Sequence, residues 1–230
     1  MQIDQILART ANWPELCRCL AAMPPALAAT ASEQRYDAGA LLQQKGDEVD
    51  RLGILCRGSL RVVNPFDTGD SYVIEQDDAV DFVGDVVLLA GERRAPISLQ
   101  AVTDCLILWF ERAAFARWVQ GDPALLRLMA GHIAGKLYRS SYRHGQPLFY
   151  PGPRLLADFL SRYADQNRPG DDGRYRVTDT RQQLAQLLGL SQKTVDRAVA
   201  QLKKQQLIDT DRGKIVFSDR QAAGLRELGS

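Results

Sequence analysis

Cysteine and histidine, the residues that form disulfides and most often bind metals, are scarce in this chain. Its 230 residues include four cysteines and two histidines. The cysteines form no C-x-x-C pair and the histidines offer no zinc-ligand spacing, so the sequence predicts neither a disulfide framework nor a metal site. Long hydrophobic runs are also absent, and the N-terminus MQIDQILARTANW has no basic region followed by an apolar run. We therefore expect no membrane span, no secretory signal and a cytoplasmic protein.

Catalytic motifs are missing as well. The sequence contains no G-x-S-x-G, no P-loop and no paired-carboxylate motif with a nearby histidine, and its segment GERRAPIS is not a dinucleotide-binding loop. We expect no catalytic residues and no enzymatic activity.

Charge is nearly balanced over the whole chain, with a net of +1, but it is unevenly distributed. Residues 1–149 hold 15 Lys and Arg against 18 Asp and Glu, a net of −3, whereas residues 150–230 hold 14 against 10, a net of +4. A basic C-terminal part is what a phosphate-binding half requires. The length and the hydrophobic content of 45% predict a globular chain of about two domains.

Residues 180–208, TRQQLAQLLGLSQKTVDRAVAQLKKQQLI, predict two short helices joined by a turn. Thr180 can cap the first helix with Gln183 as its capping-box partner, Gly189 tolerates the left-handed turn, and Ser191 can cap the second helix. The predicted inward side chains are Leu184, Leu187, Leu188, Val195, Ala198, Val199 and Leu202. This arrangement is the pattern of a helix-turn-helix.

The second of these helices is polar on its other face. Any surface helix is solvated on one side, but Gln, Lys, Thr and Arg in the first two turns stand where a recognition helix presents side chains to base edges. The candidate DNA-binding residues are Thr180, Arg181, Ser191, Gln192, Lys193, Thr194, Arg197, Lys203 and Lys204. The last two lie where they could meet phosphates. The following segment LIDTDRGKIVFSD predicts a β-hairpin wing.

The N-terminal half changes pattern twice. Residues 1–31 predict helices interrupted at Pro14 and at Pro24–Pro25, and from Glu33 to about Phe110 short Val, Ile and Leu runs alternate with glycines, as in a β-sandwich or roll. Asp67–Asp70 is expected at a hairpin tip. Helices are expected again at Arg112–Val119 and at about residues 124–143, and GQPLFYPGP, residues 145–153, is expected to be a hinge.

The helix at about 124–143 carries two apolar stripes, one of them Leu125, Leu128 and His132. Two stripes need two partners, so one could cover the strands and the other could pair with a second subunit; alternatively both are buried within one chain. The candidate dimer-interface residues are Leu126, Met129, Ile133 and Leu137.

Together these motifs resemble the Crp/Fnr transcription regulators. The family's helix-turn-helix typically reads T-R-x-x-L-A-x-x-x-G-[LC]-[ST]-[RI]-E-T-V-x-R, and this chain has TRQQLAQLLGLSQKTVDR; the stretches YDAGALLQQKGDEVDRLGILCRGSLRVV and DTGDSYVIEQDDAVDFVGDVVLLAG resemble the family's cyclic-nucleotide-binding-type roll. Gln192 stands where the family often has Arg, and Lys193 where it usually has Glu, whereas Arg197 is retained.

The resemblance implies an α+β fold. Residues 1–145 would form an N-terminal, jelly-roll-like β-roll sensor domain that ends in the long dimerisation helix, and residues 146–230 a C-terminal winged helix-turn-helix domain. It further implies a homodimer that binds pseudo-palindromic double-stranded DNA, with RNA polymerase as a partner if the protein is an activator. The alternative is a cyclic-nucleotide-binding regulatory protein that acts through protein contacts rather than DNA.

The effector site departs from the family's G-E-L turn and R-S pair, which bind a cyclic phosphate. The turn reads Gly84-Asp85-Val86, and the pair falls on Arg94-Ala95 or Ala95-Pro96. Five carboxylates crowd the neighbourhood and would repel a phosphate, namely Glu75, Asp77, Asp78, Asp81 and Asp85. We therefore predict no tight cyclic AMP binding.

Ser140 and Ser141, by contrast, favour cyclic nucleotide binding, because they fall near the position where cyclic-AMP-binding relatives place a Thr-Ser pair. The candidate effector-pocket residues are thus Gly84, Asp85, Val86, Arg94, Ser140 and Ser141. Cys17 and Cys19 are too few and wrongly spaced for the iron–sulfur cluster of some relatives, and His132 and His144 give little support for haem. No cofactor is therefore certain, and both cyclic nucleotide and haem are disfavoured.

Overall fold

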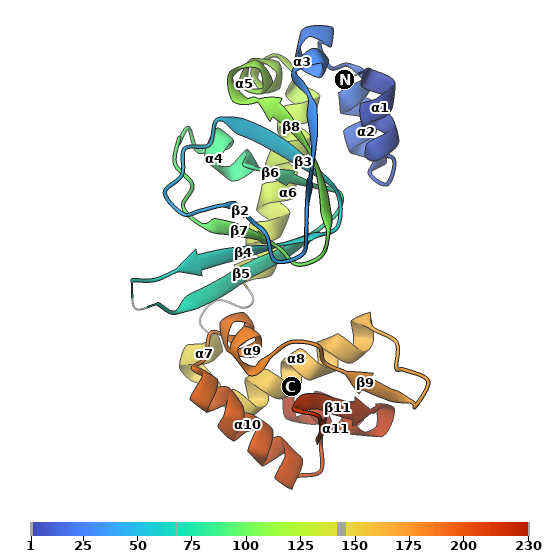
Figure 1. Ribbon diagram of the computed structural model, residues 1–230, viewed down its shortest axis with the longest axis vertical. Coiled ribbons are helices and arrows are strands. Elements are labelled where there is room, and N and C mark those ends of the chain that lie inside the picture. The colour runs from blue at the N-terminus through green and yellow to red at the C-terminus, as the bar shows by residue number, and fades with distance from the viewer. Residues whose placement is uncertain (1, 68, 142–145, 230) are drawn as a thin grey trace. The chain divides into compact units, whose positions relative to one another are not determined.

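The computed structural model describes residues 2–67, 69–141 and 146–229 (Figure 1). The chain divides into two compact units, Met1–Tyr142 and Arg143–Ser230. The expected domain boundary after residue 145, the expected end of the long helix at Arg143, and His144 lie outside the described residues.

The first unit begins with three short helices, α1 (Ile3–Arg9), α2 (Pro14–Ala21) and α3 (Pro25–Thr30). Pro14 and Pro25 each occupy the first helical position, where the missing N–H is not needed and the fixed φ suits the helix. The prolines predicted to interrupt the helical segment therefore mark the points where new helices begin.

The strands that follow form two antiparallel sheets in the described part of the chain, in the orders β1-β8-β3-β6 and β2-β7-β4-β5. Their bounds are β1 Ser32–Tyr36, β2 Leu41–Gln43, β3 Arg51–Arg57, β4 Ser59–Pro65, β5 Ser71–Asp78, β6 Asp81–Val83, β7 Ser98–Ala101 and β8 Cys105–Glu111. This confirms the predicted roll of short strands. The expected hairpin tip connects β4 and β5, although Thr68 within it is not described.

Strand β8 shows how the first unit is layered. Ile107 and Trp109 pack between the two sheets, whereas Leu108 and Phe110, on its other face, pack against the helices. This follows from the two-residue period of a strand, which sends successive side chains to opposite faces. The near-continuous apolar sequence CLILWF is thus buried on both sides.

In the described residues of this unit, three more helices follow: α4 (Asp85–Leu89), α5 (Arg112–Gly121) and α6 (Pro123–Ser141). Leu125 and Met129 of α6 are fully buried in the core that α5 and the N-terminal helices share. Figure 1 shows α6 running along the roll from α5 to the β4–β5 hairpin. No helix in the described residues is long and apolar enough to cross a membrane.

The second unit is a small helical domain with a three-stranded sheet in the order β10-β11-β9. Its elements are α7 Gln146–Phe149, α8 Gly152–Gln166, β9 Arg174–Arg176, α9 Arg181–Leu188, α10 Gln192–Lys204, β10 Asp209–Asp211, β11 Lys214–Ser218 and α11 Asp219–Gly229. The predicted helix pair and wing are confirmed. The described part of the expected hinge, residues 146–153, contains α7 and the start of α8.

Candidate DNA interface and effector cavity

The turn between α9 and α10 has the predicted caps. The Thr180 hydroxyl accepts a hydrogen bond from the Gln183 backbone N–H at 3.2 Å, and the Gln183 side chain accepts one from the Thr180 N–H at 2.7 Å. Gly189 adopts a left-handed φ of 64°, and Ser191 Oγ accepts from the Thr194 N–H at 3.2 Å. These bonds fix the start of α10 relative to α9.

The orientation of α10 is fixed by its apolar face. Val195, Ala198, Val199 and Leu202 are buried in the core of the second unit, as predicted. The polar face is consequently held outward.

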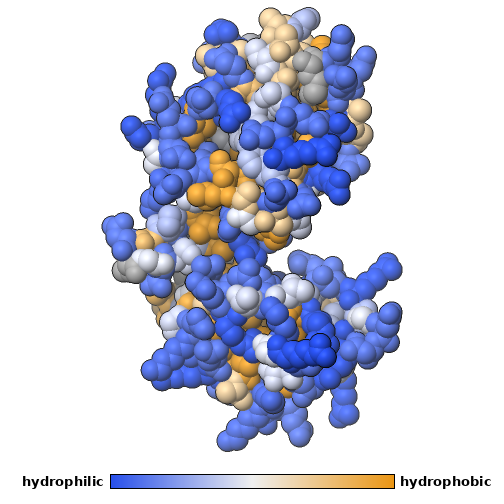
Figure 2. Space-filling view, in the orientation of Figure 1, coloured by the Kyte–Doolittle hydropathy of each residue, from blue (hydrophilic) through white to orange (hydrophobic). Residues whose placement is uncertain are grey.

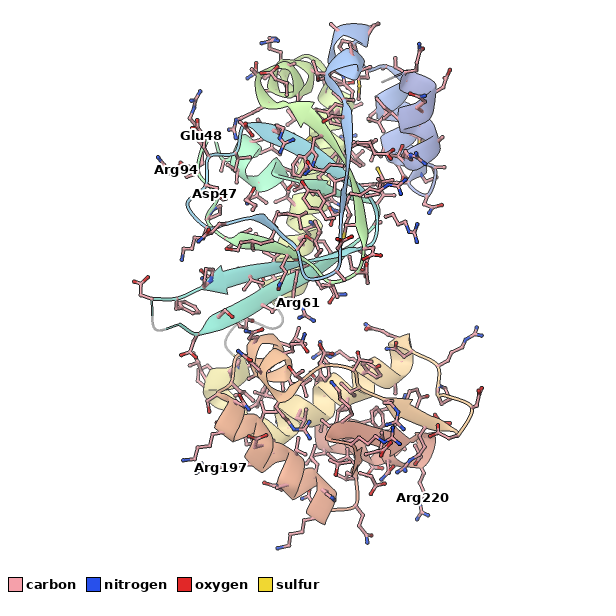
Figure 3. All side chains as sticks on the ribbon, viewed as in Figure 1. Asp47, Glu48, Arg61, Arg94, Arg197 and Arg220 are labelled. Atoms are coloured by element: carbon pink, nitrogen blue, oxygen red, sulfur yellow. The ribbon has the colours of Figure 1, made fainter. Side chains whose placement is uncertain are left out.

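On that outward face, Gln192, Lys193 and Arg197 are exposed, and Figure 3 shows Arg197 projecting from α10. Lys203 is exposed too, but its ammonium donates to the Thr210 hydroxyl in β10 at 3.0 Å, while Lys204 lies exposed in the last turn. The predicted base-contacting and phosphate-contacting positions are therefore presented in order along one helix.

Besides the capping residues Thr180 and Ser191, two further candidate residues make contacts within the domain. Thr194 is half-buried: its hydroxyl lies 2.8 Å from Ser191 Oγ, and its methyl lies where a Cβ on Gly152 would come within 3.0 Å. Arg181 is half-buried, with its Nε 3.6 Å from the Asp196 carboxylate, so it joins α9 to α10. Helical spacing alone could not separate these side chains from the fully exposed ones.

The wing adds a cation that the sequence analysis missed. Arg212 and Gly213, with φ of 47° and 80°, form a two-residue turn between paired Asp211 and Lys214. Arg212 is exposed at its tip, and Arg176 holds the wing to β9 by an ion pair with Asp211 at 2.6 Å. The sequence signal was the D-R-G-K turn, which places an arginine at the tip of a hairpin.

The first unit contains a cavity of about 440 Å³ whose lining comes from strands of the roll, α4 and α6. Its apolar lining includes Leu60, Val62, Ile74, Ile97, Leu99, Ile133 and Leu137, and its polar lining includes Glu75, Asp77, Asp85, Lys136 and Ser140. Figure 2 shows apolar residues in the middle of this unit, surrounded by hydrophilic ones. The cavity is an apolar site with acidic groups.

Four of the six predicted effector-pocket residues line this cavity: Gly84, Asp85, Val86 and Ser140. Arg94 and Ser141 lie outside its lining. The Arg94 guanidinium donates to the Gly46 carbonyl at 2.9 Å, in the outer loops where Figure 3 shows it near Asp47 and Glu48. The exposed Ser141 hydroxyl donates to the Leu137 carbonyl at 2.8 Å. Neither residue therefore lines the cavity with the other four.

An ionic cluster joins α6 to the roll beside the cavity. The Lys136 ammonium lies 3.1 Å from Asp77 in β5 and 2.8 Å from Asp81 in β6, and His132 Nε2 lies 2.6 Å from the other Asp81 oxygen. The His132 ring also packs on Trp13, with ring centroids 4.9 Å apart. His132 is thus held by a carboxylate and two aromatic rings, the second being Phe82.

The carboxyl groups of this cluster have pKa values that are shifted in different directions. Burial and the Asp81 charge raise the pKa of Asp77 to about 7 against the opposing Lys136 ammonium. Burial would also raise the pKa of Asp81, but the His132 hydrogen bond and the Lys136 charge hold it below the ordinary value. Burial raises the pKa of Asp85, although Lys136 opposes the shift.

The predicted dimer stripe on α6 is partly exposed. Leu126 and Leu137 are 41% and 64% exposed, and Ile133 is half-buried. Met129 is instead fully buried in the unit's own core and is unavailable to a partner. The covered face of α6 is therefore wider than its sequence periodicity suggested.

A β-roll with a cavity, a long helix and a winged helix-turn-helix with a basic outward face define a DNA-binding regulator of two units. Residues 33–122 match the cyclic nucleotide-binding domain model, and residues 155–227 match the Crp-like helix-turn-helix domain model. The chain belongs to the Crp/Fnr family of transcription regulators. It is a DNA-binding transcription regulator, and the alternative of action through protein contacts is not favoured.

Named relatives are similar over most of their length. The chain is 24% identical to the "cAMP-activated global transcriptional regulator CRP" of Salmonella typhimurium over 79% of this chain and 87% of that protein. It is 25% identical to the "cAMP-activated global transcriptional regulator Vfr" of Pseudomonas aeruginosa over 84% and 93%. The structure of the c-di-GMP responsive regulator CLP of Xanthomonas campestris matches with a TM-score of 0.75 at 17% identity, over 83% and 95%, which shows a shared fold. The family consists of transcription regulators rather than enzymes.

Proposed function

We propose that this regulator binds, as a homodimer, to a two-fold pseudo-palindromic DNA site, with one α10 helix in the major groove of each half-site. The outward face of α10, with Gln192, Lys193 and Arg197 exposed above a buried apolar face, carries the proposal. Two such helices related by a dimer axis would lie about one turn of DNA apart, roughly 34 Å. If the protein activates transcription, RNA polymerase would be a partner. Its action on DNA would take place in the cytoplasm.

The side chains of α10 suggest an altered half-site. A glutamate at the position of Lys193 would accept a hydrogen bond from a cytosine amino group, but lysine has no acceptor. Lys193 would instead donate to a guanine or thymine acceptor, or turn to a phosphate. Gln192 can pair with adenine through its donor and its acceptor, and Arg197 favours guanine.

The exposed part of α6 supports the homodimer. Leu126 and Leu137 leave apolar surface uncovered in the single chain, and the corresponding helix pairs two subunits in the family that this chain resembles. A closed two-fold pairing would place the same stripe on both sides of the interface. An effector bound in the roll cavity would contact this helix directly, because Ile133 and Leu137 line the cavity.

Selection of bound sites from a random duplex pool tests the DNA proposal. We expect the full-length protein to recover a pseudo-palindrome that lacks the cytosine preference of a glutamate at position 193. A Lys193→Glu variant, selected in parallel, should regain that preference. Recovery of the same half-site by both proteins would contradict this reading of Lys193, and recovery of no preferred sequence would contradict the proposed function.

A further inference from the structure

The cavity of the first unit has a polar end that is dominated by acids. Among its described lining residues, Glu75, Asp77 and Asp85 contribute carboxylates and Lys136 contributes an ammonium. That ammonium already lies against two carboxylates, Asp77 at 3.1 Å and Asp81 at 2.8 Å. The positive charge of Lys136 is therefore already neutralised by these two carboxylates. A phosphate entering here would meet a net negative field.

Asp85, in the lining of this cavity, has incomplete hydrogen bonding among the described residues. The residue is 4% exposed, and its Oδ2 atom has no hydrogen-bond partner within the described residues. An unsatisfied buried acceptor costs free energy, and more so when it belongs to an ionisable group. Burial raises the pKa of this carboxyl, so its charge is disfavoured until a positive group approaches.

The remaining wall is hydrocarbon. Leu60, Val62 and Leu99 contribute from the second sheet, and Ile133 and Leu137 from α6. A volume of about 440 Å³ lies in the range of small-molecule sites. The lining thus provides burial for an apolar body and one buried acceptor for a donor group.

We propose that this cavity binds a compact apolar molecule that carries a protonated amine, with the ammonium donating to Asp85 Oδ2. The inference rests on the proposed role of the roll as the sensor domain and names the ligand class of that site. It sets this chain apart from the relatives whose names describe activation by cAMP. The amine pairs with the buried carboxylate, and the apolar body covers the leucine and valine side chains.

Calorimetry with three matched probes on the full-length protein tests the proposal without DNA. Phenethylamine, phenethyl alcohol and phenylacetate share an aromatic body and differ in the charge of the polar group. We expect phenethylamine to bind about tenfold or more tightly than the alcohol, and phenylacetate to bind most weakly, because the amine alone can pair with a carboxylate.

The variant Asp85→Asn keeps the shape of the side chain and removes its charge. We expect it to weaken phenethylamine binding by roughly tenfold or more, while the affinity for phenethyl alcohol stays within about twofold. Asp67→Asn, a matched change at an exposed position in the β4–β5 turn, should leave all three affinities unchanged. The thermal midpoint of Asp85→Asn without ligand should equal or exceed that of the parent protein, which would show that the variant folds.

Three outcomes would overturn the proposal: no saturable phenethylamine binding at millimolar concentration, phenylacetate or cyclic AMP binding more tightly than the amine, or an amine affinity that Asp85→Asn leaves unchanged. Site selection from the random duplex pool depends on α10 and not on Asp85. A failure of the ligand proposal would therefore leave the DNA result standing, and the reverse also holds.

Discussion

Arg197 and Lys204 lie on the same helix, about two turns apart, and are suited to different contacts with DNA. The planar guanidinium of Arg197 can pair with both guanine acceptors, whereas the lysine ammonium at the end of α10 would act as a point charge near a phosphate. Removing each side chain should therefore produce different losses.

Arg197→Ala should cost roughly 1–3 kcal/mol on the preferred site and relax one base position, because a base-specific pair is lost. Lys204→Ala should weaken preferred and random duplexes alike and reduce the salt dependence of binding by about one ion. Fluorescence anisotropy over a salt series measures both effects. Equal losses for Arg197→Ala on preferred and random duplexes would remove it from base recognition.

Asp77 should make the stability of the first unit depend on pH. Its pKa is raised from 3.8 to about 7, so between these values the folded state retains a proton that the unfolded state releases. The stabilisation is present at the acidic end of this window and is lost as pH rises through about 7. The raised pKa of Asp85 acts in the same direction, whereas the lowered pKa of Asp81 acts below this window.

Urea unfolding between about pH 5 and about pH 8 should therefore show stability that falls with pH, by at most about 1.4 kcal/mol per pH unit for one proton. Asp77→Asn should flatten this slope because the position no longer titrates. Asp67→Asn, in the exposed turn, should keep it. A slope unchanged in Asp77→Asn would show that another group carries the dependence.

At the residue scale, the sequence predicted best where chemistry is local. Thr180, Gly189 and Ser191 have the capping roles assigned to them because caps depend on neighbours within a few positions. The full burial of Met129 and the partial burial of Arg181 were not foreseen, because their environments come from other segments of the chain. Helical spacing shows that two faces differ, but the packed fold decides how far each is covered.

Among the elements, α6 allows the most direct test of the proposed homodimer. Leu137 is 64% exposed in the single chain, so an aspartate there would remain solvated in a monomer. In the proposed homodimer the same charge would be buried without a partner, which is strongly destabilising. The substitution should thus act on assembly rather than on folding.

Leu137→Asp should give monomers in analytical ultracentrifugation, with an unchanged thermal midpoint at low concentration and a large loss of affinity for palindromic DNA. Leu41→Asp offers a matched control, since Leu41 is 56% exposed on β2 and lies off α6. A Leu137→Asp protein that remained dimeric would place the interface elsewhere.

Elements were predictable where glycines, prolines or the helix-turn-helix pattern marked their ends. The glycine-punctuated strands and the α9–α10 pair were found, whereas α4, α7, α8, β9 and α11 were not predicted. The five-residue sequence of α4, DVVLL, is too short to show a helical period and reads equally as a buried strand. α7 has four residues, including a proline, within a stretch rich in turn formers.

For the whole molecule, the two-part organisation was visible in the charge distribution and in the change from two-residue to helical periodicity. The ligand class was not, because the acceptor on Asp85 and the ion pairs of Lys136 depend on segments that fold together from residues 77 to 136. The sequence could count the carboxylates but could not show which of them has a buried oxygen without a hydrogen bond in the described residues.

Ile133 and Leu137 line the cavity and also belong to the stripe proposed to pair two subunits. Ligand binding and self-association would then use the same side chains. By thermodynamic linkage, the factor by which the ligand changes the dimerisation constant equals the factor by which dimerisation changes the ligand affinity. The amount of this protein in a cell would thus help to set the effector concentration at which it responds, so that changing its expression retunes the sensor without any change in sequence.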